Sequence, residues 1–162
     1  MAGFLWFTER ISRLMNVIAL IALTFIMLLT VADVIMRMGW IRQPIIGTFE
    51  IVGMAGAIVI GFGTPFTSWV RGLVFVDVFV NKLPGWGKNF ANILTRAVGI
   101  IIFVVIGYNL CSFATDLLVS GEVTPTRQIP FYPVVYGLGF ACFIQCLVLV
   151  ADVIKIIGGS YE

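Results

Sequence analysis

Four long apolar stretches dominate the sequence, and short segments that hold nearly all of the charged residues separate them. A helix rises about 1.5 Å per residue, so about 20 apolar residues cross a hydrocarbon core of about 30 Å. The strands of a membrane β-barrel would instead be about ten residues long with alternating polarity. The uncharged stretches are longer and predominantly apolar: Leu14–Ala32, Ile51–Val70, Ala97–Thr115 and Gln128–Ala151. The pattern predicts an all-α integral membrane protein with four transmembrane helices, over about residues 14–36, 50–70, 90–118 and 131–156.

Two shorter segments, over about residues 3–13 and 72–83, are expected to form amphipathic helices in the cytoplasmic-side interface. The first mixes aromatic side chains with acidic and basic ones, a composition that suits the boundary between headgroups and acyl chains. The second is too short to cross the bilayer. Because no internal repeat or polar linker divides the chain, it is predicted to be a single membrane domain over residues 1–162.

The placement of lysine and arginine predicts the orientation of the chain, because cytoplasmic loops carry an excess of both residues. Four spans put both termini and the segment between the second and third spans on one side, which holds seven of the ten basic residues. We therefore expect both termini in the cytoplasm. The seven are Arg10, Arg13, Arg71, Lys82, Lys88, Arg96 and Lys155, and the other three are Arg37, Arg42 and Arg127.

Composition narrows the possible functions further. Only 11% of the residues are charged, against about 25% in a soluble domain. The net charge of +2 is small and scattered, so nucleic acid is not an expected partner. The chain has no histidine, which argues against histidine-ligated haem. Cys142 and Cys146 share a helical face, as a thiol pair or soft-metal site would; small apolar packing residues, Cys111 included, are the simpler interpretation.

The middle of each predicted span lacks ionisable side chains. A self-contained ion-coupled carrier usually keeps such a group at mid-membrane, where it binds or releases the coupling ion. Gln145 is the only strongly polar residue near the middle of a span, while Asn109 lies nearer an end. A lone glutamine is expected to bond a neighbouring helix. We predict a scaffold chain, without catalytic, cofactor or metal-binding residues of its own, that works with a protein partner.

Small residues are spaced for close helix packing. Gly53, Ala57 and Gly61 recur every four residues on one face of the second span, and Gly137 and Ala141 do so in the fourth. Small side chains let helices approach closely in lipid, where packing replaces the hydrophobic effect. These faces could contact each other or another subunit, and internal contact is the simpler interpretation.

Charged residues gather at the outer ends of the first two spans. Asp33 precedes Arg37 by four residues, the favourable order for a helical ion pair. Glu50 begins the second span, where a negative charge suits the helix dipole, and Arg42 lies between the two spans. This cluster is either a network that fixes the first outer loop or a docking surface for a soluble partner.

The order and spacing of three loose motifs point to one family. The first span ends in Thr30-Val31-Ala32-Asp33-Val34-Ile35-Met36-Arg37, and Pro44-Ile45-Ile46-Gly47-Thr48-Phe49-Glu50 opens the second. Gly121-Glu122-Val123-Thr124-Pro125-Thr126 precedes Ile129-Pro130 and the aromatic start of the fourth. Over nearly its whole length the chain resembles the small membrane subunit (small permease, or Q subunit) of tripartite ATP-independent periplasmic (TRAP) transporters.

The resemblance implies a scaffold subunit in the bacterial inner membrane, without enzyme activity or cofactor. A separate large membrane subunit would bind substrate and sodium ions and move by an elevator-type mechanism. A soluble periplasmic binding protein would deliver an organic acid such as a dicarboxylate or a sialic acid. By position, the resemblance implies an outer docking and structural cluster of Asp33, Arg37, Arg42, Glu50, Glu122 and Arg127.

Two other functions remain as alternatives. A self-contained four-helix exporter needs a carboxylate embedded in the membrane, whereas Asp33 and Glu50 lie close to the ends of their spans. A redox or haem-anchoring membrane subunit needs histidine ligands or a reactive cysteine pair near the surface, and the sequence offers neither.

Overall fold

The computed structural model describes residues 2–38, 44–70, 72 and 85–157, with side chains over 3–38, 44–70, 72 and 93–155. This part of the chain forms four long helices, each with a segment long and apolar enough to cross a membrane. The predicted all-helical architecture with four such helices is confirmed. The helices are α1 (Ala2–Met38), α2 (Thr48–Trp69), α4 (Gly85–Ser120) and α5 (Tyr132–Ile157).

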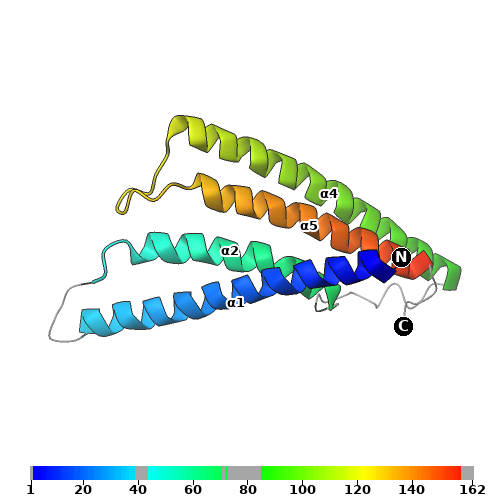
Figure 1. Cartoon of the computed structure of the whole chain (residues 1–162), viewed down its shortest axis with the longest axis horizontal. Coiled ribbons are helices and arrows are strands. Elements are labelled where there is room, and N and C mark those ends of the chain that lie inside the picture. Colours follow the sequence, from blue (N-terminus) through cyan, green and yellow to red (C-terminus); the bar gives the residue numbers. More distant parts are fainter. Residues whose placement is uncertain (1, 39–43, 71, 73–84, 158–162) are drawn as a thin grey trace.

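The helices fan out in the order α1, α2, α5, α4 from one end of the molecule (Figure 1). We call this end, where α1 begins and α5 finishes, the terminal end; the opposite end, which carries residues 44–47 and 121–131, is the loop end. Helix α5 is central, because it contacts α4, α2 and α1. Among the described helices, α4 contacts α5 alone and is therefore an edge helix.

Helix α1 differs from its predicted form at its N-terminal end. We expected a separate interfacial helix over residues 3–13, but these residues form the first turns of α1 without a break. The physical reason is a continuous buried stripe of Thr8, Ser12, Met15 and Ala19, which passes through the expected boundary at helical spacing. The Thr8 and Ser12 hydroxyls donate to carbonyl oxygens one turn earlier, which lets polar side chains stay inside the packed face.

The second predicted interfacial helix, residues 72–83, lies outside the described residues except for Gly72, which is not helical. The other span boundaries agree with the helices to within a few residues, except that α4 begins five residues earlier than the predicted third span.

The central position of α5 comes from close contacts on two of its sides. On one side Gly61 of α2 lies against the side chains of Leu138 and Ala141. On the other, a Cβ atom at Gly107 of α4 would lie 3.3 Å from the Cys142 Cβ atom. In the most apolar stretch of α5, 33% of the residues are accordingly buried within the chain, against 11% in the corresponding stretch of each of the other three helices.

Most of the large apolar side chains are exposed, mainly along α1 and α4. Water would not tolerate so extensive an apolar surface on a monomer. The chain is therefore a multi-pass membrane protein whose exposed sides face lipid or other membrane-spanning helices.

Candidate functional site

Asp33 anchors the first loop to the end of α1. Its buried carboxylate accepts a hydrogen bond from the Ile45 backbone N–H at 2.9 Å and another from the Arg37 Nε at 2.8 Å. The Arg37 side chain stays largely exposed while it pairs with this carboxylate. Because the bonded residues lie twelve positions apart, Asp33 fixes where the chain re-enters the bundle after the loop.

Glu50 joins the two loops at the loop end. It lies in the first turn of α2, and its two carboxylate oxygens accept from the backbone N–H groups of Thr126 at 2.8 Å and Arg127 at 3.1 Å. These partners follow Glu50 by 76 and 77 residues. One side chain therefore holds the α4–α5 loop against the start of α2.

Arg127 links the second loop directly to the first. Its Nε donates to the Ile46 carbonyl oxygen at 2.9 Å, and its side chain passes over Gly47. A Cβ atom at Gly47 would lie 2.6 Å from the Arg127 Cγ, and its φ of +84° is one that other residues rarely adopt. Glycine at this position therefore lets the first loop turn tightly beneath the arginine.

Asp33, Arg37, Glu50 and Arg127 form one connected set through the adjacent backbones of Ile45 and Ile46, which we call the loop-end network. Of the other two predicted members, Arg42 lies outside the described residues. Glu122 is exposed and makes no hydrogen bond or ion pair with other described residues. The structure thus brings four of the six predicted residues together and leaves Glu122 free at the surface.

Thr124 organises the second loop and was not among the predicted residues. Its side chain is almost fully buried, and its Oγ1 accepts from the Ile129 N–H at 3.0 Å. The Thr124 N–H donates to the Ile129 carbonyl oxygen, and its own carbonyl accepts from the Gln128 N–H. The sequence did carry a signal for this role, a threonine directly before Pro-Thr. Threonine hydroxyls in turns commonly form hydrogen bonds with nearby backbone groups.

An apolar hollow of about 350 Å³ opens beside the network, lined by Phe49, Glu50, Gly53, Met54, Thr124, Pro125 and Phe131. The Phe49 side chain is 90% exposed next to it, although phenylalanine is usually buried. Nothing lies within 4 Å of where a Cβ atom of Gly53 would be. Gly53 therefore borders the hollow instead of packing on a helix of this chain.

The remaining small residues lie differently. Gly61 and Ala141 meet where α2 crosses α5, and a Cβ atom at Gly137 would lie 3.5 Å from the Phe62 ring. Ala57 is half-buried on α2. These positions place part of the predicted packing faces inside the chain.

The terminal end holds contacts of charged side chains that the sequence analysis did not predict. Arg96 of α4 and Asp152 of α5 are almost fully buried, with Nε and Oδ2 3.7 Å apart. The Lys155 Nζ lies 3.5 Å from the centre of the Trp69 ring, which joins α5 to α2. The sequence carried a signal for this pair: Arg96 directly precedes the uncharged stretch of the third span, and Asp152 directly follows that of the fourth. Antiparallel packing of consecutive spans brings these two positions to the same depth.

Within the described residues, Gln145 makes no hydrogen bond to a neighbouring helix, where we expected one. It is buried, and its Oε1 has no hydrogen-bond partner among the described residues. The next residue, Cys146, directs its Sγ toward the Ile100 carbonyl oxygen of α4 at 3.8 Å. The three cysteines are free thiols on or near the α4–α5 contact.

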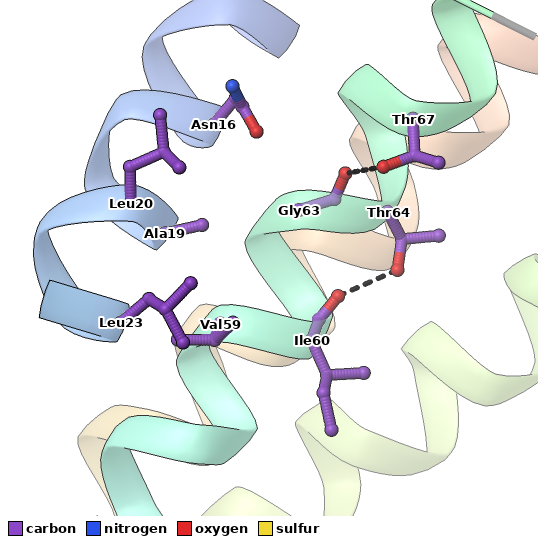
Figure 2. Close-up of a pocket in the computed structure, with 9 residues that line it drawn as sticks. All are labelled: Asn16, Ala19, Leu20, Leu23, Val59, Ile60, Gly63, Thr64 and Thr67. Atoms are coloured by element: carbon purple, nitrogen blue, oxygen red, sulfur yellow. Dashed lines mark hydrogen bonds between the residues drawn. The ribbon is translucent and has the colours of Figure 1, made fainter. Parts of the chain in front are cut away.

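A groove of about 350 Å³ between α1 and α2 is lined mainly by aliphatic side chains (Figure 2). Its two threonines donate to their own helix, Thr64 to the Ile60 carbonyl oxygen and Thr67 to that of Gly63. No charged side chain lines the groove. Within the described residues there is also no group of three or more Cys, Asp or Glu residues that could hold a metal ion.

Comparison with known proteins gives one match. A family described as tripartite ATP-independent periplasmic transporters, DctQ component, matches residues 26–159. This range runs from the last third of α1 to beyond the end of α5 and includes every member of the loop-end network. Searches of curated proteins and of solved structures give no match.

Proposed function

The chain belongs to the DctQ component family of TRAP transporters, and we propose that it is the small scaffold subunit of a sodium-coupled importer of organic acids. This family comprises transporter components, not enzymes. In the proposed assembly a separate large subunit binds sodium and a dicarboxylate or sialic acid and moves as an elevator. A soluble binding protein delivers the substrate to the periplasmic side of the inner membrane.

The distribution of charge supports a scaffold in place of a carrier. In the described residues, Asp33 and Glu50 are bonded within the loop-end network, and Asp152 faces Arg96 near the terminal end. Secondary transporters bind ions and substrate at mid-depth, typically at interrupted helices with exposed backbone groups. Helices α1, α2, α4 and α5 each continue without interruption through their apolar segments. The moving, ion-binding site therefore belongs on another chain.

The joining of the two loops by Glu50 is the observation that best supports docking of the binding protein. Two mobile loops would have to be ordered on binding, at a cost in conformational entropy. Here four side chains already tie both loops to α1 and α2. With both termini cytoplasmic, as the excess of basic residues at that end supports, the loop end faces the periplasm. The exposed Phe49 and Glu122 then offer apolar and acidic contacts there.

Reconstituted transport tests this function. The chain is purified with its separate large subunit, placed in proteoliposomes, and supplied with the binding protein and an inward sodium gradient. We expect uptake of an organic acid that requires both membrane subunits, the binding protein and the gradient. Uptake that persists at full rate without this chain, or transport by this chain alone, would contradict the proposal.

A further inference from the structure

The loop-end half of the α4 face that points away from α5 carries four polar residues among apolar ones such as Val105 and Val119. Asn109, Ser112 and Asp116 follow one another at helical spacing, and Tyr108 lies one turn before Ser112. All four are exposed. The opposite face of α4, with Gly107, Ala114 and Leu117, is buried. We call Tyr108, Asn109, Ser112 and Asp116 the α4 polar stripe.

The stripe reaches the depth of the hydrocarbon core. Arg96 and Asp116 are 20 residues apart on α4, which corresponds to about 30 Å, the thickness of that core. Asn109 lies three residues from their midpoint, or about 5 Å along the axis. It is also two residues from Gly107, where α4 meets the middle of α5. Asn109 is therefore closer to this midpoint than to Asp116, which corrects the expectation that it lies nearer an end.

Lipid cannot satisfy the polar groups of this stripe. Asn109 donates through Nδ2 to the Val105 carbonyl oxygen at 2.8 Å, which leaves its own carbonyl oxygen exposed. Tyr108, Ser112 and Asp116 make no side-chain hydrogen bond to other described residues. Acyl chains offer neither donors nor acceptors, so polar side chains turned toward them are costly. A protein helix with hydrogen-bonding groups at the same depth removes that cost.

We propose that the α4 polar stripe is where a membrane-spanning helix of the large subunit packs, with its own polar and small side chains opposite Tyr108, Asn109 and Ser112. This inference rests on the proposed function, and adds to it the surface on which the two membrane subunits meet. The position of α4 at the edge of the fan leaves the whole stripe accessible to such a helix (Figure 1).

Two other arrangements fit the contacts less well. The α1–α2 groove has fewer polar groups to satisfy: Thr64 and Thr67 are bonded to their own helix, which leaves the Asn16 amide as the one lining side chain with polar groups unbonded to other described residues (Figure 2). A second copy of this chain on the stripe would meet it through a two-fold axis, with the same residue from each copy at the same depth. The two Asp116 carboxylates would then approach each other and repel.

Photo-crosslinking in the native membrane tests the contact. p-Benzoylphenylalanine replaces Tyr108, which is 72% exposed, or Ile60 of α2, which is 74% exposed, in a chain co-expressed with the large subunit. We expect the Tyr108 position to crosslink to the large subunit at least fivefold more than the Ile60 position. Crosslinks to lipid alone or to a second copy at Tyr108, or stronger crosslinking from Ile60, would overturn the inference.

The same experiment separates this inference from the proposed function. If the large subunit does not co-purify with the unmodified chain, in the absence of any crosslinker, the proposed function fails. If it co-purifies but Tyr108 does not crosslink to it, only the assignment of the stripe fails.

A pair of substitutions provides a second measurement. Asn109→Leu removes the amide, whereas Ile106→Leu changes an exposed side chain outside the stripe three residues away and keeps its volume. We expect Asn109→Leu to lower the affinity for the large subunit about threefold, the size typical of one hydrogen bond between membrane helices, and Ile106→Leu to leave it unchanged. Equal recovery of the large subunit with both variants, at equal yield of folded chain, would overturn the inference.

Discussion

Single residues at the loop end carry several connections at once. Both oxygens of the Glu50 carboxylate accept hydrogen bonds from backbone N–H groups of the second loop. Arg127, in that second loop, donates to a backbone carbonyl oxygen of the first. The sequence indicated the acidic and basic members, because charged residues are conspicuous in so apolar a chain. It could not indicate that most of their partners are backbone groups, since any residue supplies those. The turn that Gly47 makes under Arg127 was hidden for the same reason.

Replacing Glu50 by glutamine should loosen the second loop. The amide keeps one acceptor oxygen and turns an N–H group toward a backbone N–H, so one of the two bonds at Thr126 and Arg127 is lost. We expect limited proteolysis within residues 121–131 to become several-fold faster. Glu122→Gln, in the same loop but without a bond to other described residues, serves as the control and should not change the rate. Equal cleavage of the two variants would contradict this role of Glu50.

Gly47 and Gly53 form a matched pair for testing the first loop. Gly47→Ala must adopt a positive φ and place its Cβ atom against Arg127, so we expect it to lower the free energy of unfolding by about 1–2 kcal/mol. Gly53→Ala meets nothing within 4 Å inside a helix, so we expect no loss and a gain of up to about 1 kcal/mol. Unfolding in mild detergent measures both. Similar effects from the two alanines would show that the loop is not tightly turned in the membrane protein.

At the scale of the helices, the hydrophobic pattern predicted four elements and missed where α1 and α4 begin. An uncharged stretch marks the part of a helix that lipid can cover, but a helix continues wherever its neighbours keep packing against it. Thr8 and Ser12 extend α1 in this way, through hydroxyls bonded to their own backbone. Arg96 and Asp152 extend the α4–α5 contact by facing each other. Such pairing depends on which helices are neighbours, and a single sequence does not state that.

The buried Arg96–Asp152 pair predicts a non-additive effect on stability. Asp152→Leu leaves the buried guanidinium of Arg96 without this carboxylate, so we expect it to lower the free energy of unfolding by about 3–5 kcal/mol. The double variant Arg96→Met with Asp152→Leu removes both charges and should be more stable than either single variant. Denaturant titration in micelles measures the four free energies of this cycle. If the losses from the two single changes add up in the double variant, the pair is not coupled.

At the scale of the whole molecule, the helices form an open fan with a bonded loop end and two exposed sides. Composition and charge placement predicted a scaffold, because no ionisable residue fell at mid-span. Which surfaces meet a partner depends on the order of the helices, α1, α2, α5, α4, and became visible only with α4 at the edge. Asn109 illustrates the limit: its polarity was visible in the sequence, but its exposed position on a helix that contacts α5 alone was not.

Docking of the binding protein at the loop end predicts an effect of charge on association. Glu122 is exposed at that end, whereas Glu9 lies in the first turns of α1, at the terminal end. We expect Glu122→Lys to slow association of the binding protein with the reconstituted membrane complex several-fold at low salt, and less at high salt. Glu9→Lys should leave the rate unchanged. Surface plasmon resonance on captured nanodiscs compares the two, and an effect of Glu9→Lys alone would place the dock at the opposite end.

Co-purification tests the central claim, that this chain is a scaffold subunit that works with a separate large permease. The chain is tagged in its native membrane, solubilised in mild detergent and purified, and the proteins that accompany it are identified and quantified. The account predicts a stoichiometric large subunit with many spans. Recovery of this chain alone, as a homodimer that transports by itself, would contradict the account and return attention to Asp33 and Glu50 as coupling residues.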